Sequence, residues 1–415
     1  MTSKQGASAF APGELDPTFG VDGVVQIPNG SGSLRCMIED EQGSIVHGLW
    51  VSNEIWLYRI LADGSADLQF GEEGVTKWGF APGSLSVPVQ LLLQADGKYV
   101  LIGSLRNSLS DEQSRVAVTR FNSNGTPDLV FGNKILPLPA EGNVFTEFPS
   151  HGCLQGDGKI LVAAPYTLVD QQQIVYRGTR LHRLLANGES DLEFGGGRGF
   201  IEVRLNGQDT TIASVVIARD GKILVGGTLD RIRDGVSDRK QSIARFTPMG
   251  ALDQAFGCHG YWEEEGYNST GRIILDDQER IIVVGTESAE NGNYYVCISR
   301  LTVDGEFDKA FNSGSRLSVD IPVDFPGYYV TCSSVALQAS GKIIAAGHAG
   351  ANTQSYWLRV QTSGVLDPGF GVQGVRVYEP SKLMGGVLVQ RNTQRIVAGI
   401  DSATHPIPEI LGILS

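Results

Sequence analysis

The 415-residue chain lacks the features that mark several common functional classes. Its formal net charge is −13, so positive charge is in short supply. An acidic surface repels nucleic-acid phosphates and anionic lipids, so we expect no nucleic-acid partner. No apolar stretch approaches the roughly 20 residues that a membrane-spanning helix needs, so we expect no membrane insertion.

The first ten residues also lack the apolar core of a secretory signal peptide. We therefore expect residues 1–12 to form a short leader. The protein is then either cytoplasmic or exported by a route that needs no such signal, and the sequence leaves its localisation open between the two.

Cysteine and histidine are too scattered to indicate a metal centre. The five cysteines are odd in number and show no C-x-x-C spacing, which favours buried free thiols over disulfides or a zinc site. The six histidines form no spaced pair, and no nucleophile elbow marks a hydrolase serine. We accordingly assign no catalytic residue, no metal ligand and no cofactor, which favours a protein that is not an enzyme.

The chain has instead one motif written seven times. The first copy is Gly-Glu-Leu-Asp-Pro-Thr-Phe-Gly at residues 13–20, and every copy keeps a glycine, an aspartate three residues later and a phenylalanine three residues after that. The repeat glycines are Gly13, Gly64, Gly125, Gly188, Gly250, Gly305 and Gly364. Their successive spacings are 51, 61, 63, 62, 55 and 59 residues. A near-constant period of this size indicates a repeat architecture.

Each unit also carries a hairpin signal and an apolar strand that contains an arginine. In the clearest copies, at residues 93–101, 154–162 and 217–225, Asp-Gly-Lys stands between two apolar segments. Asp-Gly in this setting predicts a two-residue turn, because such turns need positive φ. In the second unit we expect four strands, near residues 75–80, 87–94, 98–102 and 116–121.

These units predict an all-β protein, a seven-bladed β-propeller with four antiparallel strands per blade. We interpret one unit as one blade in a single domain over residues 13–415. The units span residues 13–63, 64–124, 125–187, 188–249, 250–304, 305–363 and 364–415. The chain ends should then be neighbours, with blade packing alone closing the ring. A solenoid would need capping ends, which the chain does not show.

The repeated residues resemble those of a known family. The Asp-x-x-Phe-Gly turn, the apolar strand, the Asp-Gly-Lys-Ile-Leu-Val hairpin and the Arg-Leu strand are similar to the signature of the bacterial delta-60 repeat proteins. The resemblance runs from about Gly13 onward and is most specific in the middle units. It implies a β-propeller of a kind often found in secreted or surface-associated bacterial proteins, and it implies no catalytic residues.

We expect the repeated residues to hold the blades together. Six aspartates follow an arginine by eight residues, which predicts the ion pairs Arg59–Asp67, Arg120–Asp128, Arg183–Asp191, Arg245–Asp253, Arg300–Asp308 and Arg359–Asp367. Asp16 has no such arginine, so we expect it to rely on backbone N–H groups alone. The seven phenylalanines should be buried between blades. Calcium loops are the alternative, but most copies offer too few carboxylates.

Any binding function should lie on one face of the disc. Antiparallel strands alternate in direction, so the Asp-Gly hairpins and the Asp-x-x-Phe-Gly connectors share a face, and the other connections share the opposite face. Those other connections include residues 104–115, 165–176, 228–241 and 286–294, which are long and differ between units, as binding loops do. The candidate ligand-binding residues there are Trp78, Arg106, Tyr166, Arg231, Tyr294, Tyr295, Tyr328, Tyr329 and Tyr356.

Three functions remain open. The leading hypothesis is a non-enzymatic binding or scaffold propeller that engages a protein partner through the variable loops. The first alternative is a carbohydrate-binding, lectin-like propeller, although the aromatic residues do not recur at one offset in every unit. The second is a propeller enzyme, such as a lyase, hydrolase or lactonase, at the central channel. That enzyme would need carboxylates or histidines that converge on the axis.

Overall fold

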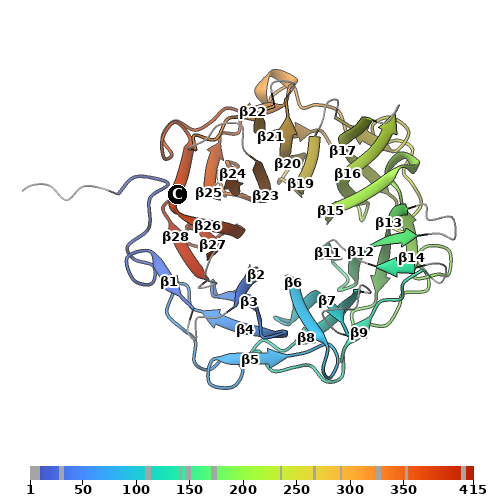
Figure 1. The fold of residues 1–415 in the computed structure, drawn as a ribbon, viewed down its shortest axis with the longest axis horizontal. Coiled ribbons are helices and arrows are strands. Elements are labelled where there is room, and N and C mark those ends of the chain that lie inside the picture. The colour runs from blue at the N-terminus through green and yellow to red at the C-terminus, as the bar shows by residue number, and fades with distance from the viewer. Residues whose placement is uncertain are drawn as a thin grey trace, which may run out of the picture.

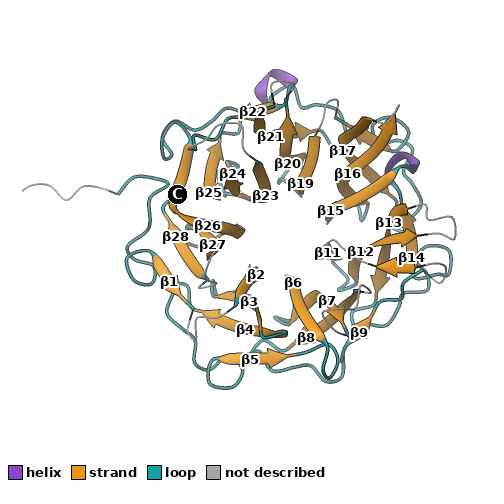
Figure 2. Cartoon of the chain, in the orientation of Figure 1, coloured by secondary structure: helices purple, strands orange, loops and turns teal. Residues whose placement is uncertain are grey.

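The computed structural model of the chain is a ring of seven blades (Figure 1), and the innermost strands line a central channel. It describes residues 10–27, 32–107, 114–139, 143–145, 151–169, 175–233, 236–264, 268–289, 292–323, 329–350, 354–402 and 408–415. Strands dominate, and the helices of these residues are two short 3-10 turns, η1 (Leu205–Gly207) and η2 (Asn312–Gly314) (Figure 2). No helix in the described ranges has the length and apolar character needed to cross a membrane.

Each blade is an antiparallel sheet, and we number the blades I to VII in chain order. From the channel outward, blade I contains β2 (Ser33–Glu39), β3 (Ile45–Val51), β4 (Glu54–Ile60) and β5 (Val75–Trp78). Blade II contains β6 (Leu85–Leu93), β7 (Tyr99–Arg106), β8 (Arg115–Phe121) and β9 (Lys134–Ile135). In blade III, β10 (Asn143–Phe145) and β11 (His151–Leu154) both pair with β12 (Ile160–Val169), followed by β13 (Val175–Leu184) and β14 (Phe200–Val203).

Blades IV to VI repeat this order. Blade IV contains β15 (Asp209–Ile217), β16 (Ile223–Arg233), β17 (Val236–Phe246) and β18 (Tyr261–Glu263). Blade V contains β19 (Asn268–Leu275), β20 (Ile281–Ser288), β21 (Tyr294–Leu301) and β22 (Leu317–Val319). Blade VI contains β23 (Val330–Leu337), β24 (Ile343–Ala349), β25 (Gln354–Val360) and the first part of β26 (Val375–Val389). The second part of β26 begins blade VII, which continues with β27 (Ile396–Ser402) and β28 (Glu409–Ile413). The fold class predicted from the repeats is confirmed.

The outermost strand of blade VII comes from the other end of the chain. Strand β1 (Val24–Gln26) pairs antiparallel with β28, with Val24 opposite Leu411. Leu15 forms a further bridge with Ile413, so the described parts of the two chain ends are neighbours, as predicted. The expectation that packing alone closes the ring is wrong, because backbone hydrogen bonds join the first and last strands.

The interpretation of one repeat unit as one blade is therefore wrong by one strand. Residues 75–80 were expected to begin blade II, but β5 is the outer strand of blade I and pairs with β4. The Asp-x-x-Phe connector thus joins the third and fourth strands of one blade, and the Asp-Gly turn joins the first and second. Repeat spacing gives the order of strands along the chain but not which strand lies innermost.

This shift leaves the assignment of loops to faces unchanged. The Asp-Gly turns and the Asp-x-x-Phe connectors still share one face, which we call the turn face. The opposite face, which we call the loop face, carries the connections between second and third strands and those between each fourth strand and the next blade. The variable segments identified in the sequence belong to this loop face.

The repeat phenylalanines pack between blades, as predicted. At most 1% of each side chain is exposed, and the seven are Phe19, Phe70, Phe131, Phe194, Phe256, Phe311 and Phe370. Phe131 shows why a glycine follows in the next repeat. Gly188 has φ +86°, and a Cβ there would lie 2.7 Å from the Phe131 ring, closer than carbon atoms can approach. Ring packing and the repeat glycine therefore specify each other across a junction.

Candidate functional site

The predicted Arg–Asp ion pairs all form, and they belong to the scaffold. The Nε–Oδ2 distances are 2.7 Å for Arg59–Asp67, 3.0 Å for Arg120–Asp128, 2.7 Å for Arg183–Asp191, and 2.8 Å for Arg245–Asp253, Arg300–Asp308 and Arg359–Asp367. Each guanidinium also lies over the phenylalanine of its own motif, at 4.5 to 5.0 Å from the ring centroid. The charge pair and the aromatic core thus form one unit.

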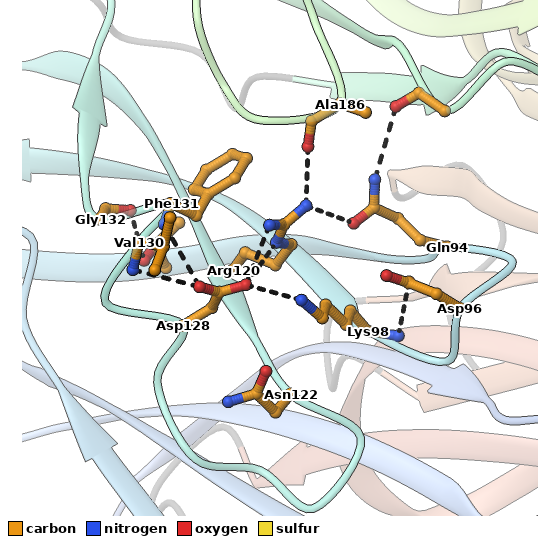
Figure 3. Close-up of polar contacts among 12 residues, drawn as sticks. Gln94, Asp96, Lys98, Arg120, Asn122, Asp128, Val130, Phe131, Gly132 and Ala186 are labelled. Carbon is orange, nitrogen blue, oxygen red and sulfur yellow. Dashed lines mark hydrogen bonds and ion pairs between the residues drawn. The ribbon is translucent and has the colours of Figure 1, made fainter.

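Figure 3 shows this unit in blade II and its link to blade III. Arg120 Nη1 donates to the Ala186 carbonyl of the next repeat at 2.7 Å. Lys98 Nζ lies 3.0 Å from Asp128 Oδ2 and provides a second cation. Burial by itself would raise the pKa of Asp128, but hydrogen bonds from Lys98, the Phe131 N–H group and Arg120 lower it to about 2.

The second cation was not predicted, although the lysine of Asp-Gly-Lys was already visible in the sequence. Its contact follows from the strand order, since the Asp-Gly turn and the Asp-x-x-Phe connector lie on the same face of one blade. The equivalent contacts are Lys159–Asp191, Lys222–Asp253, Arg280–Asp308 and Lys342–Asp367.

Asp16 corrects a further expectation. It does not rely on backbone donors alone, because Arg395 Nε lies 2.7 Å from its Oδ2 atom. Arg395 directly precedes β27, which is the position that the Asp-Gly-Lys lysine takes in other blades. It is separated from Asp16 by 379 residues in the chain. The closing junction therefore uses an arginine beside the second strand of its blade, whereas the other six junctions use an arginine in the third strand.

No group of three or more His, Cys, Asp or Glu side chains in the described part of the chain could hold a metal ion. All five cysteines are free, and Cys258 is exposed, which corrects the expectation that they are all buried. The ion pairs described above are repeated structural contacts of the turn face. The features that differ between blades lie on the loop face and in the channel.

The candidate residues of the loop face fall into three groups. Arg106 and Tyr329 are exposed, at the end of β7 and just before β23. Tyr294 and Tyr295 are half-buried at the start of β21. Arg231 lies in β16 but nothing is described of its side chain, and Tyr328 lies outside the described residues.

The remaining three candidates make internal contacts. Trp78 packs edge-on against Phe121 at 6.0 Å between ring centroids. The half-buried Tyr166 donates its hydroxyl proton to Glu202 at 2.9 Å. Tyr356 is a correction, because it is fully buried in β25 and donates to the Thr331 carbonyl at 2.6 Å. Every residue of β25, from Gln354 onward, is buried, so aromatic character alone was a poor guide to exposure.

The most distinctive feature of the loop face is a pair of long hairpins in blades III and IV. Strand β16 continues to Arg233 and pairs there with Val236 of β17, whereas β3 in blade I turns after seven residues at Ser52–Asn53. Strands β12 and β13 extend to a comparable length.

One carboxylate connects these two hairpins, as strand lengths in the sequence could not show. Asp230 of β16 accepts a hydrogen bond from Arg239 Nε at 2.8 Å within its own hairpin. The same side chain lies 3.9 Å from Arg177 Nη1 of the neighbouring β13. The two projections therefore present one connected polar surface.

Comparison with known proteins finds four segments of the chain that are similar to one family model. Four segments match the family described as "Domain of unknown function (DUF5122) beta-propeller", at residues 94–131, 218–256, 280–311 and 338–370. Each match runs from near an Asp-Gly-type turn to the phenylalanine of the following motif. No curated protein matches the chain.

Several solved structures match the chain at low sequence identity. Selenomethionine-substituted virginiamycin B lyase from Staphylococcus aureus is 12% identical with a TM-score of 0.53, covering 94% of this chain and 98% of that one. The extracellular domains 1-2 of Drosophila semaphorin 1b are 10% identical with a TM-score of 0.48, covering 97% and 88%. A glucose dehydrogenase is 10% identical with a TM-score of 0.44, covering 94% and 99%. The match to virginiamycin B lyase, at 12% identity, shows a shared fold alone.

Proposed function

We propose that this chain is a delta-60-type repeat propeller that works as a non-enzymatic binding scaffold and engages a protein partner through its loop face. The observation that carries the proposal is the connected pair of hairpins formed by β12–β13 and β16–β17. They project from adjacent blades and share the carboxylate of Asp230. Variable projections on a rigid repeat scaffold are a common way to build a binding surface.

The hairpin chemistry favours a polar protein surface as the partner. Arg180 Nε lies 2.7 Å from Glu202 Oε1, and Tyr166 donates to the other oxygen of that carboxylate. Charges of both signs are thus held in place before any partner binds, which reduces the ordering cost of association. Exposed Arg106 and Tyr329 belong to residue types that often dominate interface energies.

Shortening one hairpin tests the proposal. Asp230 and Arg239 face each other across β16 and β17, so residues 231–238 can be replaced by Asn-Gly, which suits a two-residue turn. The variant keeps Asp230 and its contacts. We expect it to lose the partners that wild-type protein captures from extract of the native cell, with an unchanged thermal midpoint.

The matched control changes the turn face. Asp157 is exposed at an Asp-Gly turn, and Asp157→Ala should leave capture unchanged. Capture that survives the shortened hairpin but not the control would contradict the proposal. A glycan array probed with wild-type protein gives a separate answer, because selective glycan binding would support the lectin-like alternative instead.

A further inference from the structure

The central channel has an unusual balance of charge. It encloses a cavity of about 660 Å³ lined by the innermost strands of all seven blades. Of the described residues that line it, the cations are Arg35, Arg272 and Arg391, and the one carboxylate is Glu41. The channel lining thus carries an excess of positive charge in a chain whose net charge is −13.

Arg272 occupies a position that the other blades use differently. Six innermost strands contain a β-bulge at the same place, and Arg272 is the first residue after the bulge in β19. At the equivalent position, Ser214 donates to the Ile273 carbonyl at 3.1 Å, and Ser334 accepts from the Val387 N–H group at 2.9 Å. Small polar side chains there tie one blade to the next.

The Arg272 side chain instead extends back across blade IV. Its Nη1 donates to the Ala213 carbonyl at 2.8 Å and lies 2.7 Å from Nδ1 of His151, in blade III. Neither group carries negative charge. Burial lowers the pKa of His151 well below its usual value, and the charge of Arg272 lowers it further, so the imidazole is neutral.

Arg272 is therefore a cation without a carboxylate partner in the described part of the chain. Burial lowers its pKa to about 10, which still leaves the guanidinium protonated at neutral pH. A desolvated charge is unfavourable unless a counter-charge and hydrogen bonds compensate it. Among the described residues its hydrogen bonds involve Nη1 only, although a guanidinium carries five N–H donors in a planar fork.

We propose that the central channel is a binding site for a small oxyanion, a carboxylate or a phosphate, with Arg272 as its main ligand. The guanidinium fork matches the paired oxygens of such groups. Ser334 lines the same cavity, and because its oxygen accepts from Val387, its own proton can be donated to the anion. The cavity volume suits a small molecule. This site is independent of the partner surface proposed above.

Calorimetric titration of the whole protein tests the site, with inorganic phosphate and acetate as probes and chloride as the reference at constant ionic strength. We expect saturable binding of at least one probe to wild-type protein. Binding of phosphate alone identifies a phosphate site, and binding of acetate alone identifies a carboxylate site. Absence of saturable binding of both probes would overturn the proposal.

Variants then test whether Arg272 is the residue that binds the anion. Arg272→Gln removes the charge and Arg272→Lys removes the planar fork, and we expect both to weaken binding at least tenfold. Arg219→Gln is the matched control, because Arg219 is exposed at the blade IV turn and lies outside the channel lining. Equal affinity in wild type and both Arg272 variants would refute the assignment.

A measurement on wild-type protein guards against loss of folding in the variants. The imidazole ¹⁵N resonances of His151 should shift when the anion binds, because its Nδ1 contacts Arg272. Exposed His259 serves as the internal reference. An anion-induced shift of equal size at both histidines would contradict binding at Arg272.

Discussion

The closing junction and the regular junction between blades III and IV reach the same contacts from different parts of the sequence. In the regular junction, Arg183 of the third strand binds Asp191, lies 4.5 Å from the centroid of Phe194 and donates to the next repeat's Pro248 carbonyl at 2.5 Å. The closing junction uses Arg395, which sits beside the second strand. Both junctions therefore place a guanidinium at the same position, although different parts of the blade supply it.

Arg395 reproduces each of those contacts. It binds Asp16, lies 5.1 Å from the Phe19 centroid and donates to the Ala62 carbonyl at 2.9 Å. One difference remains. Asp191 also has Lys159 at 3.1 Å, whereas the one ion-pair partner of Asp16 in the described residues is Arg395. The closing junction thus depends on a single cation.

The largest expected effects come from the aromatic core of each junction. Phe194→Ala and Phe19→Ala should each lower the free energy of unfolding by about 3–5 kcal/mol, because both rings are fully buried. Chemical denaturation of both variants measures the effect. Equal losses would show that the closing junction is packed as well as a regular one. An unchanged midpoint for Phe194→Ala would refute the packing role.

Removal of the arginine should lower the free energy of unfolding by different amounts at the two junctions. Arg395→Met should cost about 3–5 kcal/mol, because it leaves the Asp16 carboxylate without a cation. Arg183→Met should cost less, because Lys159 still neutralises Asp191. Both are measured by denaturant unfolding. Adding Asp16→Asn to Arg395→Met should recover part of the loss, and equal costs for the two arginine variants would refute the single-cation account.

One substitution beside the closing junction, at His47, should raise the free energy of unfolding by a smaller amount. His47 lines a pocket of about 580 Å³ between blades VII and I, and neither of its ring nitrogens makes a hydrogen bond with another described residue. The equivalent residue in blade II is Leu101. His47→Leu should therefore raise the free energy of unfolding by about 1–2 kcal/mol at neutral pH.

His47→Leu should also make the free energy of unfolding depend less on pH under acidic conditions. Burial lowers the pKa of His47 from 6.5 to about 4, so the folded state resists protonation that the unfolded state accepts. Protonation of His47 therefore does not affect the free energy of unfolding above pH 6.5, and it lowers that free energy as the pH falls from 6.5 toward 4. Wild type should lose about 3 kcal/mol more than His47→Leu across this window. Parallel stability curves would contradict this.

The sequence was a good guide wherever a contact is local or repeated. Arg59 and Asp67 stand eight residues apart on either side of one connector, so their pairing follows from the period, as does the burial of Phe70. The loop face also followed from strand direction alone. Tyr356 shows the limit, because its position near a variable loop did not reveal that its strand had already entered the core.

The sequence by itself determined the repeat, the seven blades, the buried phenylalanines and the six regular ion pairs. Tertiary structure decided the rest. It chose which strand of each unit lies innermost, brought β1 to β28, placed Arg395 on Asp16 and set Arg272 beside His151, 121 residues away. Spacing records contacts within one repeat, whereas these contacts exist only after the ring has closed and its axis has been defined.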